Sequence, residues 1–191
     1  NLCSIVRTAI GLFEQMAHDQ RIKMNINIPE HPVHIMCAKD SVLTIISNLL
    51  SNAVKYGKET INIIVQCEDG ETAVVRVESD GEVIPENERE KIFQIFFQRE
   101  GAAKEGQGTG LGLPYARNLA NMHNGKLYLD GNVTEMNSFV LELPVNQKDE
   151  VKLAPSEPSI SNGEKKVNDF DTSRHTLLVV EDSEEMREYL A

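Results

Sequence analysis

Apolar positions along the first 144 residues repeat with two different periods. Helical spacing predicts helices over 4–20, 40–56 and 110–122, and alternation of apolar with polar residues predicts a strand over 22–28. Further short apolar or alternating segments predict strands over 33–37, 60–68, 72–79, 125–131 and 137–144. The pattern therefore predicts a domain that mixes helices with a sheet.

Local signals predict several boundaries of these elements. Asp40 is expected to cap the helix over 40–56, and residues 85–93 begin with proline and acidic side chains, which favours another helix start. The turn "EDGE" joins the strands 60–68 and 72–79. Residues 98–109 are polar and rich in glycine, which predicts a loop.

Composition changes after residue 144. Residues 145–174 are rich in Lys, Glu, Ser, Pro and Asn and have few large apolar groups, so they are predicted to be a flexible linker. The last segment, 175–191, contains the strand-like run "TLLVV" followed by an acidic pair and a helix start. The expected organisation is a domain over 1–144, a linker over 145–174 and the beginning of a second domain over 175–191.

Charge and cysteine content exclude several classes of function. The formal net charge is −11, which opposes direct binding to nucleic acid or to an anionic membrane. The three cysteines form no CxxC pair, which argues against a disulfide framework or a zinc site and indicates a reducing compartment. No apolar run reaches the roughly 20 residues that cross a bilayer, so membrane insertion is not expected.

Three polar side chains share one face of the predicted helix over 40–56. Asn48, Asn52 and Lys55 stand at i, i+4 and i+7, opposite the apolar residues of the same helix. Two amide oxygens and one amine suit a hydrated Mg²⁺ and phosphate oxygens. The alternative is an ordinary solvated helix face.

Glycines alternate in "GQGTGLGL", residues 106–113, immediately before the third predicted helix. Bare backbone at the start of a helix lets N–H groups approach a phosphate. The stretch fits neither G-x-G-x-x-G nor a P-loop, because leucine stands where the third glycine belongs and the Gly-Lys-Ser/Thr ending is missing.

Several motifs occur in one order: the asparagine helix, then "SDGEVIP", then "KIFQIFFQ", then "GTGLGL". In this order and spacing, residues 1–144 resemble the ATP-binding domain of sensor histidine kinases, within the wider family of gyrase-type and Hsp90-type ATPases. The resemblance implies an α+β fold: a two-layer sandwich of three helices packed on a mixed, mostly antiparallel sheet. It also implies ATP and Mg²⁺ as cofactors.

The resemblance assigns roles to individual residues. It implies that Asn52 is the Mg²⁺ ligand and a catalytic residue with Asn48 in support, and that Lys55 and Tyr56 contact phosphate and adenine. Residues 98–107 would form a lid over the nucleotide, with Arg99 or Lys104 reaching phosphate. The phosphates would lie on the glycine box and its neighbours: Gly108, Thr109, Gly110, Leu111 and Gly112. Phe93, Phe96 and Phe97 resemble the family's phenylalanine box, with packing in the core as their plainer interpretation.

Three positions in two motifs depart from the family pattern: Ser79, Val83 and Thr44. The family's Asp-x-Gly-x-Gly box, whose Asp holds adenine, reads Ser79, Asp80, Gly81, Glu82, Val83 here. Ser79 is in phase with the inward-facing residues of its strand, so Ser79 rather than Asp80 is expected at the adenine. Thr44 stands where the family often carries a Glu, His or Gln that assists phosphoryl transfer, which puts the catalytic rate in question.

The C-terminal segment resembles the start of a response-regulator receiver domain. Glu181 and Asp182 match the acidic pair that helps to hold Mg²⁺ there, although the phosphorylated Asp of such a domain would lie beyond residue 191. The two resemblances together imply a hybrid sensor histidine kinase. Its expected partners are an upstream dimerisation and histidine-phosphotransfer domain and the downstream receiver, in a cytoplasmic homodimer or in the cytoplasmic part of a membrane-anchored sensor.

The expected activity is transfer of the ATP γ-phosphoryl group to a histidine of the dimerisation domain, in signal transduction. His18, in "HDQRI", lacks the Thr-Pro of a phosphoacceptor box, so this chain alone is not expected to autophosphorylate. One alternative is a degenerate pseudo-kinase that binds nucleotide weakly and acts as a scaffold or regulatory domain. Another is an ATP-driven switch of the Hsp90 or gyrase type, which the short lid and the receiver-like tail oppose.

Overall fold

The structure is a computed structural model, and it describes residues 1–67, 69–99, 109–133 and 135–146. The chain divides into two compact units, Asn1–Leu153 and Ala154–Ala191. All the helices and strands below belong to the first unit. The predicted linker over 145–174 and the receiver-like segment over 175–191 therefore fall almost wholly outside the described residues and remain predictions.

A five-stranded sheet forms one layer of the domain, in the order β1-β2-β3-β5-β4. Its strands are β1 (Lys23–Asn27), β2 (Thr60–Gln66), β3 (Thr72–Ser79), β4 (Lys126–Leu129) and β5 (Asn137–Pro144). Only β1 and β2 pair in parallel, because α2 crosses over between them; the other neighbours are antiparallel. The expected mixed, mostly antiparallel sheet is confirmed.

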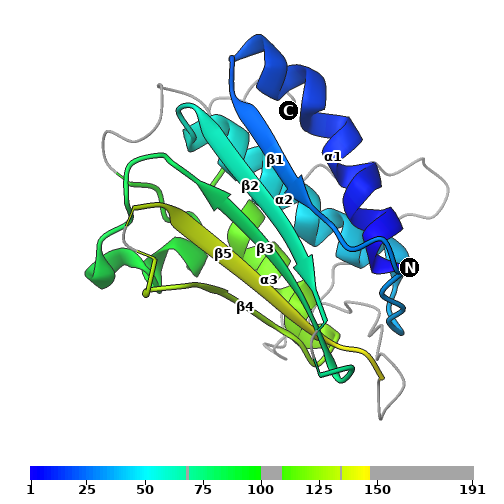
Figure 1. Cartoon of the computed structure of the whole chain (residues 1–191). Coiled ribbons are helices and arrows are strands. Elements are labelled where there is room, and N and C mark those ends of the chain that lie inside the picture. Colours follow the sequence, from blue (N-terminus) through cyan, green and yellow to red (C-terminus); the bar gives the residue numbers. More distant parts are fainter. Residues whose placement is uncertain (68, 100–108, 134, 147–191) are drawn as a thin grey trace, which may run out of the picture. The chain divides into compact units, whose positions relative to one another are not determined.

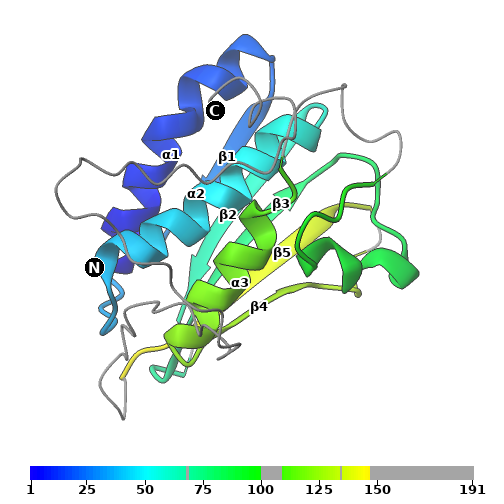
Figure 2. The same ribbon diagram turned by 180° about the vertical axis from the view of Figure 1, so that it is seen from behind.

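Helices α1 (Leu2–Asp19), α2 (Lys39–Tyr56) and α3 (Gly112–Met122) form the second layer. Figure 1 views the sheet with the helices behind it, and Figure 2 shows the helices in front. The core lies between the layers, where the inward residues of the strands meet the apolar stripe of α2, whose buried members are Val42, Ile45, Ile46, Leu49, Leu50, Ala53 and Val54. Burying these side chains against the sheet fixes α2, so its opposite, polar face is held toward α3 and the loops.

The opposite face of the sheet is polar and has its own side-chain network. Arg76 donates to both Asp130 and Ser138 at 2.8 Å, and Tyr128 donates to Glu142 at 2.7 Å. The bond to Glu142 raises the pKa of Tyr128 to about 12. Among the described residues, no helix has both the length and the hydrophobicity that crossing a membrane requires.

Three local predictions were wrong. Residues 33–37 form no strand; this segment is instead held by backbone bonds such as Met36 N–H to Val145 O at 3.1 Å. Asp40 lies inside the first turn of α2 instead of capping it, because the helix begins at Lys39 after Ala38. Residues 85–93 contain only the short 3-10 helices η1 (Glu86–Glu88) and η2 (Lys91–Phe93), which leave the chain free to turn around the site.

Candidate functional site

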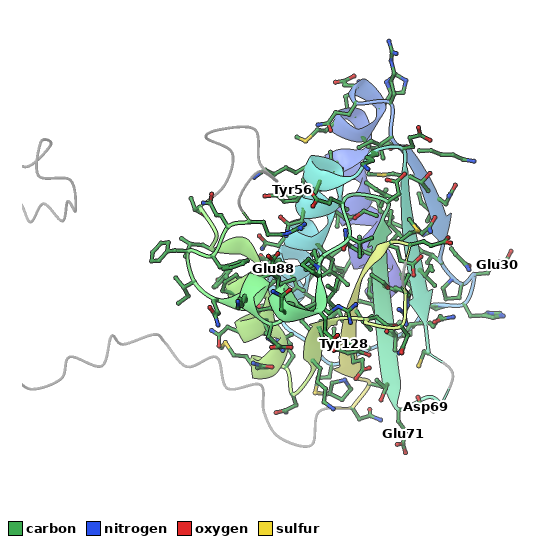
Figure 3. All side chains as sticks on the ribbon, turned by 90° about the vertical axis from the view of Figure 1, so that its left-hand side faces the viewer. Glu30, Tyr56, Asp69, Glu71, Glu88 and Tyr128 are labelled. Carbon is green, nitrogen blue, oxygen red and sulfur yellow. The ribbon has the colours of Figure 1, made fainter. Side chains whose placement is uncertain are left out.

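A cavity of about 1030 Å³ lies on the helix side of the sheet, bordered by the polar face of α2, the start of α3 and the segment between β3 and α3. Its lining includes most of the residues singled out in the sequence: Asn48, Asn52, Lys55, Tyr56, Ser79, Arg99, Thr109, Gly110 and Gly112. In Figure 3, Tyr56 and Glu88 lie on the side of the molecule that carries this segment, away from Asp69 and Glu71 at the end of the β2–β3 hairpin.

The asparagine stripe of α2 lines the cavity. The Asn48 amide nitrogen donates to Thr44 O at 2.9 Å, which leaves its oxygen for the cavity. Within the described residues, the Asn52 amide forms no side-chain hydrogen bond and Lys55 forms no ion pair; the Lys55 ammonium lies 4.8 Å from the Tyr56 ring. An amide oxygen and a cation are therefore available to a ligand.

The first turn of α3 opens onto the same cavity. Its N-terminal N–H groups have no side-chain cap, and the first residue, Gly112, lines the cavity. A Cβ on Gly112 would lie 2.6 Å from Asn48 Oδ1, so the bare backbone lets the two helices approach. Exposed N–H groups at the positive end of a helix favour an anion, and phosphate fits this geometry.

The end of β3 separates the two polar residues of the "SDG" motif. Ser79 lines the cavity and is 4% exposed. The Asp80 carboxylate does not line the cavity, because it accepts the backbone N–H groups of Lys58, Glu59 and Thr60 at 2.9–3.1 Å. Partial burial opposes ionisation of Asp80, but these backbone donors outweigh it and lower the pKa of the carboxyl.

Asn137 is a cavity residue that the sequence reasoning missed. From β5 its amide oxygen accepts Ile84 N–H at 2.8 Å, and its amide nitrogen donates to Glu82 O at 2.9 Å. It thereby fixes the 82–84 segment that forms one wall. The signal was present in the sequence, because Asn137 is a polar residue in phase with the inward-facing Phe139 and Leu141.

Arg99 lines the cavity but is bound to two carboxylates. Its Nε lies 2.7 Å from Glu88 Oε2 and its Nη2 lies 3.2 Å from Glu82 Oε1. The Arg99 side chain is 18% exposed, against 28% for Glu88 and 71% for Glu82, so the bond to Glu88 is the better shielded of the two. A phosphate that enters the cavity would compete with Glu88 for this guanidinium.

Glu88→Gln should therefore tighten binding of MgATP, on the order of threefold to tenfold, because the guanidinium loses its shielded competitor. Glu82→Gln, at the exposed partner, is the matched variant and should change affinity less. Titration calorimetry of both variants measures this. Weaker binding by Glu88→Gln would mean that Glu88 holds Arg99 in the orientation that phosphate needs.

The three phenylalanines of "KIFQIFFQ" differ in role. Phe93 is buried and packs edge-on against Phe139, with ring centroids 6.3 Å apart. Phe97 lines the cavity. Phe96 is 72% exposed and has a φ of +64°, which is strained for a non-glycine residue. Packing in the core thus explains Phe93 and does not explain Phe96.

The remaining predicted site residues lie elsewhere. Thr44 does not line the cavity, and its hydroxyl donates to Asp40 O at 2.8 Å. Gly81 packs against the Tyr56 carbonyl, and Leu111 precedes α3 with its side chain exposed; neither lines the cavity. Four residues lie outside the described part of the chain: Lys104, Gly108, Glu181 and Asp182.

Two of the described histidines, His18 and His123, take positions that suit a surface and a structural role. His18 is exposed at the end of α1, where a turn leads into β1. His123 is buried; its Nε2 accepts Ala38 N–H at 3.1 Å, and its Nδ1 lies 2.7 Å from Leu119 O. His123 therefore ties the segment before α2 to the end of α3.

Comparison with protein families gives a direct match to this arrangement. Residues 37–147, more than half of the chain, match the family described as histidine kinase-, DNA gyrase B- and HSP90-like ATPases. The chain belongs to this family. The matched residues include the asparagine face of α2, Ser79 and the start of α3, so the region matched by the family contains most of the cavity lining.

Curated relatives of this ATPase domain are sensor histidine kinases. The chain is 28% identical to WalK of Bacillus subtilis over 71% of this chain and 23% of WalK, and 39% identical to GlrK of Escherichia coli over 54% of this chain and 22% of GlrK. A match to TmoS of Ectopseudomonas mendocina, 26% identical, covers 98% of this chain and 21% of TmoS. The chain thus spans about a fifth of the length of these relatives.

A solved structure confirms the fold. The catalytic domain of the histidine kinase ThkA superposes with a TM-score of 0.68 and 26% identity, over 77% of this chain and 96% of that domain. The predicted α+β fold, with helices packed on one face of a mixed sheet, is therefore confirmed both by the described elements and by this likeness.

Proposed function

We propose that this chain is the ATP-binding catalytic domain of a hybrid sensor histidine kinase. It would transfer the γ-phosphoryl group of ATP to a histidine on an upstream dimerisation domain of a homodimeric, cytoplasmic or membrane-anchored sensor. The observation that carries the proposal is the placement of Asn52 and Lys55 in the cavity onto which the uncapped start of α3 opens. Within the described residues, Asn52 forms no side-chain hydrogen bond, and Lys55 forms no ion pair and contacts the Tyr56 ring.

The residues present fit a magnesium triphosphate. Asn52 offers an amide oxygen, a ligand type that hard cations accept, and Asn48 presents a second oxygen beside Gly112. Bound Mg²⁺ would neutralise phosphate charge. Lys55 and the N–H groups of α3 would hold phosphate oxygens, and Tyr56 would contact the adenine. Positioning and charge neutralisation are the main contributions that a protein makes to phosphoryl transfer.

The acceptor histidine needs a surface on which its domain can dock next to the cavity. Ile95 and Phe96 are exposed, and so are Leu111 and Tyr115, one turn apart at the start of α3. The two pairs are joined, because Phe96 N–H donates to Gly110 O at 3.1 Å. We assign this apolar surface, formed by Ile95, Phe96, Leu111 and Tyr115, to contact with the dimerisation domain, since exposed apolar groups gathered beside a cavity are typical of interaction sites.

The hybrid character rests on the tail. The match to TmoS extends over almost the whole chain and so includes the tail. The acidic pair of this chain's C-terminal segment, Glu181 and Asp182, would help to hold Mg²⁺ in a receiver domain that accepts the phosphoryl group in a later step.

A second candidate function is a pseudo-kinase that binds nucleotide without efficient transfer. The observation that favours it is Ser79, a neutral side chain at the inner end of β3 where a carboxylate would anchor adenine more strongly. The Thr44 hydroxyl, bonded to Asp40 O, supplies no catalytic group to the cavity. Phosphoryl transfer is the property that separates the two functions.

Incubation with γ-labelled ATP and Mg²⁺ tests the proposal. The chain alone should remain unlabelled, because the described histidines lie at a helix end, in the 31–34 segment or in the core, away from the cavity lining. Adding the separately purified dimerisation domain of the full-length protein should place label on that domain only. Label on the isolated chain would contradict this, and His18 would then be the first residue to replace.

Phe96→Ala serves as the docking variant in the same assay. It should leave ATP affinity unchanged and slow labelling of the dimerisation domain by about tenfold, the effect of losing one apolar anchor of an interface. Leu12→Ala, at an exposed apolar position of α1, is the matched control and should transfer normally. ATP binding without any transfer by the native chain would support the pseudo-kinase instead.

A further inference from the structure

The cavity has two chemically different ends, separated along α2. Asn48 lies against Gly112, at the uncapped start of α3, where phosphate fits. Tyr56 lies eight residues further along α2, about 12 Å away at the rise of an α-helix. Ser79 is adjacent to that second end, because a Cβ on Gly57 would lie 3.7 Å from the Ser79 Cβ. With phosphates at the first end, the base of a nucleotide reaches Tyr56 and Ser79.

The carboxylates near this second end are committed elsewhere. Asp80 is held by the backbone of residues 58–60, and Glu82 pairs with Arg99. Both ends of the Asn137 amide are used by the 82–84 segment. The Ser79 hydroxyl forms no side-chain hydrogen bond within the described residues and lines the cavity. It is therefore a side chain at this end of the cavity that can form a hydrogen bond with the edge of a base.

A hydroxyl reads a purine edge differently from a carboxylate. Adenine presents an amino donor at the position where guanine presents a carbonyl acceptor. An ionised carboxylate only accepts, so it binds the amino group and repels the carbonyl oxygen. A serine hydroxyl rotates and can accept from the amino group or donate to the carbonyl. The Ser79 hydroxyl can therefore pair with the 6-substituent of either purine, so this position does not supply the unpaired buried group that is the usual source of strong discrimination.

We propose that this site binds purine nucleoside triphosphates without strong preference for adenine, with GTP accepted alongside ATP. Ser79 is the residue that sets this relaxed specificity. The proposal rests on the proposed function, since it requires that the cavity hold a nucleotide with its base at Tyr56 and Ser79. The cavity, at about 1030 Å³, has room for either purine.

Titration calorimetry of the intact chain with MgATP, MgGTP and MgCTP tests the proposal. The dissociation constants of ATP and GTP should agree within about tenfold, because the Ser79 hydroxyl can pair with the 6-substituent of either purine. CTP should bind more weakly, because a pyrimidine covers less of the Tyr56 ring. A GTP affinity about a hundredfold below that of ATP would overturn the proposal. It would indicate that a backbone group, and not Ser79, distinguishes adenine from guanine.

Two variants test whether Ser79 determines the choice between ATP and GTP. Ser79→Asp should tighten ATP and weaken GTP, so the ratio of their dissociation constants should move by at least about tenfold toward ATP. Ser79→Ala, which does not bury a charge, should weaken both nucleotides by similar factors and leave the ratio unchanged. An unchanged ratio in a folded Ser79→Asp would overturn the role of Ser79. Failure of the native chain to bind either nucleotide would instead overturn the proposed function, and this inference with it.

Discussion

Asn52→Ala should lower the affinity for MgATP by about a hundredfold, equivalent to about 3 kcal/mol. Asn52 lines the cavity on the polar face of α2, and its amide is not used by any side-chain hydrogen bond of the described residues. If Asn52 ligates Mg²⁺ as proposed, its removal takes away an oxygen ligand without breaking a side-chain hydrogen bond of the described residues. Calorimetric titration with ATP at saturating Mg²⁺ measures the loss.

Chelation of Mg²⁺ separates a metal ligand from a phosphate contact. With the divalent cation removed, native chain and Asn52→Ala should bind ATP equally weakly, because the missing oxygen then has no cation to hold. Asn121→Ala, at an exposed asparagine near the end of α3, is the matched control and should bind MgATP like the native chain. A difference between native chain and Asn52→Ala that persists without Mg²⁺ would show that Asn52 contacts the nucleotide itself.

The elements of the fold were predictable where burial determines the pattern. The stripe of α2 and the alternation in β2 and β3 have one face in the core, so their periods appear directly in the sequence. The strand predicted over 33–37 was wrong because an apolar run needs a neighbouring strand to pair with. Here the segment is held instead by a backbone bond to Val145 and by packing on the core. The helix start predicted at residues 85–93 was wrong because acidic residues after a proline also suit a short 3-10 helix.

Some residues of the candidate site could be grouped from the sequence, and others could not. Asn48, Asn52 and Lys55 could be grouped from the sequence because one helix carries all three. The pairing of Arg99 with Glu82 and Glu88 could not, because it depends on how a loop between two elements folds back. Ser79 could be distinguished from Asp80 by strand phase alone, and the structure places their side chains in different surroundings.

The glycines at 110 and 11 should respond in opposite directions to alanine. Gly110 has a φ of +68°, and a Cβ there would lie 2.9 Å from the Cα and carbonyl carbon of Phe96. The backbone of Phe96 has little freedom to move away, because it already has a strained φ of +64°. Gly110→Ala should cost about 2–3 kcal/mol from the left-handed backbone and the collision together. Thermal unfolding should show a midpoint lowered by roughly 5–10 °C. ATP affinity should fall as well, because Gly110 lines the cavity.

Gly11→Ala is the matched control, since it adds the same methyl group in a different setting. Gly11 lies inside α1 with nothing within 4 Å of an added Cβ, so alanine gains helix propensity without a collision. It should stabilise the domain by about 0.5–1 kcal/mol and leave ATP affinity unchanged. If Gly110→Ala were instead as stable as the native chain, the close approach of residues 110 and 96 would not be a fixed feature of the fold. The apolar surface beside the cavity, which depends on that approach to join its two halves, would then lose its support.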